Sequence, residues 1–124
     1  MRHIRGVAAT LAILIVTGCE AAGDCAGVGR PSVSVTVLDQ TNESRIASGA
    51  KLYVFRNASS ALVASATGTR DDLPIETGND TGTFDLVLEK SGFFPWTATG
   101  VHVTQKCSIN TVSLTARLRP RGSA

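Results

Sequence analysis

The sequence has few of the residues on which catalytic and metal sites depend. It holds two His and three Cys, no His-Glu-x-x-His pattern, and no Ser within a Gly-x-Ser-x-Gly turn. No glycine-rich loop precedes a helical pattern, so no phosphate-binding turn is indicated either. We therefore expect neither an enzyme nor a resident cofactor nor a metal site.

Two features come closest to a chemical site. His102 lies between Val101 and Val103, so alternation along a strand places it on the solvent side. An acidic loop offers oxygen ligands of the kind that bind calcium, but its spacing fits no calcium loop. We expect both features to be solvated. The acidic loop holds Asp71, Asp72, Glu76 and Asp80.

An excess of positive charge is also missing from most of the chain. The formal net charge is +2, and Arg2 and Arg5 precede Cys19 with no acidic residue beside them. A chain that starts at Cys19 therefore holds ten basic and ten acidic residues. Binding to nucleic acid depends on clustered, surplus Lys and Arg, and is not expected.

Long hydrophobic runs are absent after the N-terminus, and the one at the N-terminus is short. Residues 7–16 are apolar except for Thr10, and a basic stretch precedes them. Ten residues are too few to cross a hydrocarbon core, which needs about 20. The length and flanks are typical of a signal peptide. Val16-Thr17-Gly18-Cys19 closes the run and resembles the lipobox of bacterial lipoproteins, with Val where Leu is commoner.

The lipobox resemblance implies where the protein goes. Residues 1–18 would be a cleaved, helical signal peptide, and Cys19 would carry diacylglycerol and an acylated (palmitate-type) amine. The product would be an exported lipoprotein held at a bacterial membrane through its N-terminal lipid. Glu20 follows Cys19 and favours the periplasmic face of the outer membrane over the inner membrane. The alternative is an ordinary signal peptide that is cleaved nearby.

The cysteine count then becomes even. With Cys19 lipidated, Cys25 and Cys107 remain in an oxidising compartment, and we predict a disulfide between them. The alternatives are that Cys25 pairs between molecules or stays free. Residues 19–31 are small and aperiodic, as in a flexible tether.

From Ser32 onward the hydrophobic period is two, which predicts strands. In the first strand the valines face inward, and Ser32, Ser34 and Thr36 face solvent. The second strand is apolar on both faces, with Leu52 on one and Tyr53 on the other, so we place it centrally. Pro95 restricts its own strand to an edge or breaks it. The predicted strands are 32–38, 50–56, 61–67, 83–89, 93–99, 101–106 and 109–118.

These strands predict an all-β, seven-stranded Greek-key β-sandwich over residues 32–120, with a frayed tail at 121–124. The segments Val-Ser-Val-Thr-Val-Leu-Asp from residue 33, Gly-Ala-Lys-Leu-Tyr-Val from 49, Gly-Thr-Phe-Asp-Leu from 82 and Lys-Ser-Gly-Phe-Phe from 90 occur in this order. Their order resembles the carboxypeptidase regulatory-like domain, a transthyretin-like or immunoglobulin-like sandwich. The resemblance implies a non-catalytic module for folding, spacing or interaction, without metal ligands.

Aromatic residues make up only 5% of the chain, and three of the six lie within residues 93–96. Phe94 and Trp96 share a face if that segment is extended, and they form a candidate ligand face. Alternatively they fill the core. The function predicted is therefore a structural or interaction module of the cell envelope, whose partner is another envelope protein or a glycan. The second hypothesis is a carbohydrate- or peptide-binding module that uses this aromatic face.

Overall fold

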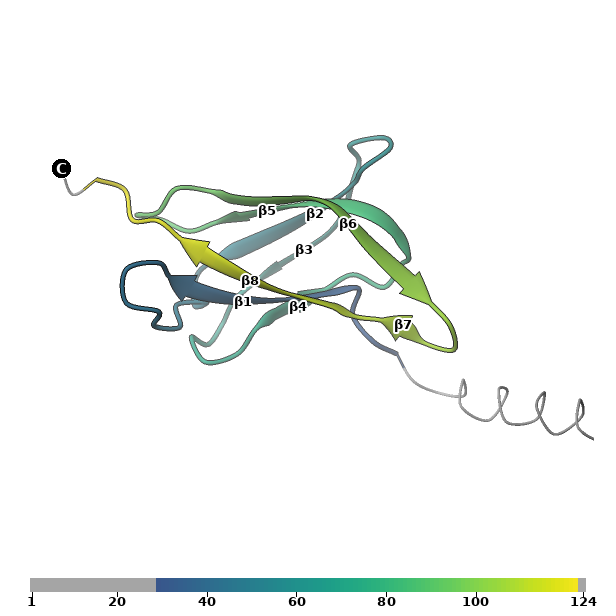
Figure 1. Cartoon of the computed structure of the whole chain (residues 1–124), viewed down its shortest axis with the longest axis horizontal. Helices are drawn as coiled ribbons and strands as arrows, with labels where there is room; N and C mark the ends of the chain where they lie inside the picture. The colour runs from purple at the N-terminus through teal and green to yellow at the C-terminus, as the bar shows by residue number, and fades with distance from the viewer. Residues whose placement is uncertain (1–28, 123–124) are drawn as a thin grey trace, which may run out of the picture.

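The computed structural model describes residues 29–122, which form an all-β domain of two packed sheets (Figure 1). The predicted signal peptide, Cys19 and Cys25 lie outside the described residues. Within residues 29–122 there is no helix of the length and apolarity needed to span a membrane. The predicted β-sandwich is confirmed at the level of two packed sheets.

The smaller sheet has three strands in the order β4-β1-β8. Strand β1 (Val33–Asp39) lies in the middle, antiparallel to β4 (Ile75–Thr77) and parallel to β8 (Val112–Leu118). The parallel register runs along the whole strand, from Val33 opposite Val112 to Asp39 opposite Leu118. The first and last long strands of the domain are therefore neighbours.

The larger sheet has five strands in the order β3-β2-β5-β6-β7, all antiparallel. Strand β2 (Lys51–Arg56) lies between β3 (Leu62–Thr67) and β5 (Gly82–Glu89), as its two apolar faces predicted. Strand β6 (Trp96–Gln105) follows, and β7 (Ile109–Asn110) pairs only with its end.

The core lies between the two sheets and consists of the inward positions that the alternation predicted. Strands β1, β2, β5, β6 and β8 each contribute every second residue, which is the geometry of a pleated strand. Two alanines from the β1–β2 connection and one residue of β4 complete it. Its members are Val33, Val35, Val37, Ala47, Ala50, Leu52, Val54, Ile75, Phe84, Leu86, Leu88, Val101, Val103, Ala116 and Leu118.

The described residues form eight strands, not the seven predicted, for three reasons. Residues 70–82 were predicted to be a loop, yet β4 pairs there with β1. The two predicted strands on either side of Gly100 are one strand, because Gly100 has φ +67° at a bulge opposite Asp85. The predicted strand 109–118 is two strands, since the chain changes sheets at Thr111.

Two smaller expectations were wrong. Ser32 was placed on the solvent face, but it is buried. Arg121 was placed in a frayed tail, but its backbone N–H donates to the carbonyl of Gly92 at 2.9 Å. In both cases a contact distant in sequence fixes a residue that local pattern leaves undecided.

The N-terminal and C-terminal segments of the described chain lie at opposite ends of the sandwich. Residue 29 enters at one end, and the chain finishes at the other, because β1 and β8 run in the same direction (Figure 1). We call the end opposite residue 29 the distal end. It is built from residues 40–50, 90–95 and 119–122.

Candidate functional site

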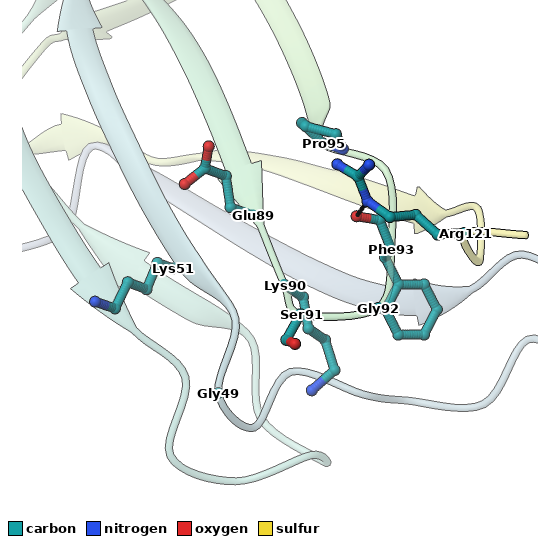
Figure 2. Close-up of a pocket in the computed structure, with 9 residues that line it drawn as sticks. All are labelled: Gly49, Lys51, Glu89, Lys90, Ser91, Gly92, Phe93, Pro95 and Arg121. Carbon is teal, nitrogen blue, oxygen red and sulfur yellow. Dashed lines mark hydrogen bonds between the residues drawn. The ribbon is translucent and has the colours of Figure 1, made fainter.

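An open groove of about 490 Å³ lies at the distal end of the sandwich (Figure 2). Its walls come from the start of β2, the end of β5, the β5–β6 turn and the segment after β8. We call it the distal groove. Its lining residues are Gly49, Lys51, Glu89, Lys90, Ser91, Gly92, Phe93, Pro95 and Arg121.

The distal groove exists because the segment after β8 pairs with the β5–β6 turn. Phe93 and Pro120 form an isolated antiparallel bridge between them. The N–H of Phe94 donates to the carbonyl of Arg119 at 2.9 Å, and the N–H of Arg121 donates to that of Gly92 at the same distance. Gly92 has φ +88°, a conformation that glycine adopts without strain, so the turn can reverse here.

An aromatic ring holds two guanidinium groups beside this pairing. The Cζ atom of Arg119 lies 4.3 Å from the ring centroid of Phe94, and that of Arg121 lies 4.9 Å from it. Both distances are within the range of cation–π attraction. The Nε of Arg121 also donates to the carbonyl oxygen of Phe93 at 3.1 Å, the contact dashed in Figure 2.

The charged side chains of the distal groove are not paired with one another. Within residues 29–122 the ion pairs are Arg56–Asp80, Arg70–Asp72 and Arg117–Glu43, and none of these residues lines the groove. Lys51 and Glu89 are opposite each other in the β2–β5 register without forming an ion pair. The Lys90 ammonium donates to the carbonyl of Ser48. The groove therefore contains three cations and one carboxylate.

The structure places the two residues of the predicted ligand face in different surroundings. Trp96 is half-buried and packs against the core, as does Phe93. Phe94 is 37% exposed and lies against the two arginines at the distal end. Pro95 stands between them and precedes β6, so the segment does not alternate as one extended strand would.

A second aromatic pair lies at the surface, and the sequence did not identify it as a candidate site. Tyr53 and Phe55 are half-buried on the face of β2 that points away from the core, with ring centroids 6.4 Å apart and planes 27° apart. Their alternation with the buried Leu52 and Val54 was the signal that could have located them. A central strand has two faces, and here only one of them is core.

The aspartates of the acidic loop make hydrogen bonds and ion pairs with other residues of the domain. Asp71 accepts from the N–H of Ser48 at 2.9 Å, and Asp72 pairs with Arg70. The backbone N–H of Thr81 and the Arg56 guanidinium hold the pKa of Asp80 below its usual value. Within the part of the chain that the structure covers, no three His, Cys, Asp or Glu residues are grouped so as to hold a metal ion.

His102 and Cys107 are the other residues that the sequence singled out. His102 is exposed, as expected, and a ring nitrogen lies 3.1 Å from the Thr83 hydroxyl. Cys107 is half-buried in the β6–β7 turn, beside residues 29–31, and is not a free thiol. Its predicted partner, Cys25, lies outside the described residues, so the pairing stays a prediction.

A scan against protein-family models finds no match for the chain, and a search of curated proteins finds no significant match. The resemblances to lipoproteins and to the carboxypeptidase regulatory-like domain remain predictions. The candidate site is an open, cationic groove at one end of an all-β domain.

Proposed function

We propose that this protein is a lipid-anchored lipoprotein of the bacterial envelope whose non-catalytic β-sandwich is an interaction module. Cys19 carries the lipid after removal of residues 1–18, and residues 19–31 are the tether. The protein sits at the periplasmic face of the outer membrane. The observation that carries the proposal is the position of the distal groove, at the end of the domain opposite residue 29. A tether on that side turns the groove away from the membrane.

We further propose a transthyretin-like Greek-key topology of the carboxypeptidase regulatory-like kind. Two features support it. The chain crosses between the sheets after β1, β3, β4 and β7, and the first and last long strands are parallel neighbours in one sheet. The resemblance in sequence covers the same strands.

Cell fractionation tests the anchor. Cys19→Ser should move the protein from the membrane fraction to the soluble exported fraction, because each lipid-buried CH₂ contributes about 0.8 kcal/mol to membrane binding. Cys25→Ser is the matched control and should stay in the membrane fraction. Intact mass should show a lipidated residue 19 at the N-terminus. If Cys19→Ser fractionates like the wild type, the anchor is wrong.

A second candidate function is carbohydrate or peptide binding through an aromatic face. The stacked rings of Tyr53 and Phe55 on the outer face of the larger sheet favour it, since sugars stack on such rings. A glycan array with the wild-type protein and Tyr53→Ala would test it. Glycan binding that survives Tyr53→Ala would place the sugar elsewhere.

A further inference from the structure

We infer that the distal groove is a binding site for an oxyanion, a phosphate or carboxylate group carried by a ligand of about the size of one sugar unit. This inference rests on the proposed function in one respect: the anchor leaves the distal end facing away from the membrane, where a ligand can reach it. It adds the chemical class of the ligand and the residues that bind it: Arg121 and Lys51, with Phe94 as a positioning residue.

Arg121 is held in place before any ligand arrives. Its backbone N–H bonds to Gly92, its Nε bonds to the carbonyl of Phe93, and its guanidinium lies over the ring of Phe94. Its Nη atoms make no hydrogen bond to another described residue. A guanidinium fixed at one edge offers its remaining donors in a fork that matches a carboxylate or phosphate. Because the side chain is already ordered, binding costs little further entropy.

The charge of the distal groove selects for an anion. Lys51, Lys90 and Arg121 oppose only Glu89, and none of the four is in an ion pair with a described residue. Arg119 adds a second guanidinium at the rim through the ring of Phe94. Figure 2 shows Lys51 on one side of the groove and Arg121 on the other, with Glu89 and the start of the β5–β6 turn between them. An anion bound in the groove would offset the surplus of positive charge that remains in the lining after Glu89 is counted.

The walls indicate what carries the oxyanion. Phe93 and Pro95 contribute apolar atoms to the lining, and Ser91 and the exposed backbone at Gly49 and Gly92 contribute polar ones. At about 490 Å³ the groove lies within the range of small-molecule sites. A sugar phosphate or a uronic acid has this mixture of a charged group, hydroxyls and an apolar ring face.

A titration of the full chain in a non-ionic detergent tests the site, with inorganic phosphate and glucuronate as separate probes. Backbone amide signals of Gly49 and Gly92 and the Nε signal of Arg121 should shift in a saturable way. Arg121→Gln and Lys51→Gln should each weaken binding about tenfold or more, since a hydrogen bond to a charged group is worth about 1.5–3 kcal/mol. Phe94→Leu should weaken it less, because it only releases the guanidinium.

Lys106→Gln is the matched control. It removes one positive charge from an exposed turn at the other end of the sandwich, and should change the affinity less than twofold. Saturation by phosphate alone assigns a phosphoryl ligand, and saturation by glucuronate alone assigns a carboxylate ligand. Binding by neither probe, or equal losses in Lys106→Gln and Arg121→Gln, would overturn the site. Fractionation of Cys19→Ser is independent of this result, so the anchor and the oxyanion site can fail separately.

Discussion

Ser32 and Asp80 hold each other through a pair of hydrogen bonds across 48 residues of chain. The Ser32 hydroxyl donates to the backbone carbonyl of Asp80 at 2.6 Å and accepts from its backbone N–H at 3.0 Å. Ser32 is 1% exposed, and its own N–H donates to the carbonyl of Gly78 at 3.0 Å. This buried hydroxyl therefore fixes the β4–β5 connection against the start of β1.

Ser32→Ala should destabilise the domain by about 1–3 kcal/mol, because it removes two part-buried hydrogen bonds between the buried Ser32 hydroxyl and the backbone of Asp80. Urea unfolding followed by circular dichroism would measure it. Ser34→Ala is the control and should change stability little, because Ser34, two residues further along in β1, is half-buried and makes no side-chain hydrogen bond with a described residue. Equal effects of the two changes would contradict the role given to Ser32.

Gly68→Ala should destabilise the domain by about 1–3 kcal/mol or more, the usual cost of overpacking. A Cβ at residue 68 would lie 2.0 Å from the carbonyl oxygen of Ala47, which is backbone and cannot turn aside. Gly29→Ala is the comparison, because its Cβ would meet nothing within 4 Å. Thermal melting of both variants checks this, and an unchanged midpoint for Gly68→Ala would show that the β1–β2 connection is looser than described.

Acid should weaken the fold, with Asp85 among the groups responsible. The Asn57 side chain and the Gly100 N–H donate to its carboxylate and hold its pKa below the usual value. A lowered pKa in the folded state stabilises the fold above the unfolded value, near 4, and this contribution is lost as the pH falls through the folded value. Asp39, Glu43 and Asp80 shift in the same direction.

Asp85→Asn isolates the contribution of that residue. The variant should be less stable than wild type at pH 7 and should lose less stability on acidification, since one titrating group is gone. Melting temperatures measured between neutral and strongly acidic pH would show the two slopes. Parallel slopes would assign the acid sensitivity to the other carboxylates.

Trp96→Ala should destabilise the fold by about 3 kcal/mol, because it removes a large side chain that packs against the core. Phe94→Ala should cost much less, since Phe94 lies outside against two arginines. Trp96 is the only Trp in the chain, so circular dichroism and not fluorescence must follow both variants. If Trp96→Ala melts at the same temperature as wild type, Trp96 does not stabilise the core and is again a candidate ligand-binding residue.

If Cys25 pairs with Cys107 as predicted, the unreduced protein should resist alkylation at both residues. Closing a loop of this length contributes about 4–5 kcal/mol in the chain-entropy model, so reductant should lower the melting temperature. Intact mass after alkylation, with and without reductant, measures the pairing. Free thiols at both positions would contradict it.

The sequence predicted most of the strands because alternation is a local property. Val33, Val35 and Val37 point inward together whatever strand lies beside them, and the same holds for Phe84, Leu86 and Leu88. The prediction from sequence failed where a contact between segments distant in the chain decides the local structure. Residues 75–77 become a strand only because β1 offers a free edge, and Gly100 marks a bulge only because β5 continues opposite it.

The candidate site was harder to predict than the fold. Phe94 stood out because aromatic residues are few. Of its partners, Arg119 lies just beyond the last predicted strand, and Arg121 was assigned to a frayed tail. Nothing in the local pattern joins residues 92–94 to residues 119–121. The bonds between them are made by backbone groups, which every residue has, so composition does not reveal them.

The sequence by itself determined most of the strands and their inward faces, because alternation is a property of neighbouring residues. The delivery through Cys19 is likewise predicted from a short run of residues. Only the tertiary structure decided which strands are neighbours, that β1 and β8 run parallel, and that Lys51, Lys90 and Arg121 line one groove. Those outcomes depend on contacts between segments far apart in the chain. Their stability comes from joint burial and backbone pairing, which a local pattern permits but does not specify.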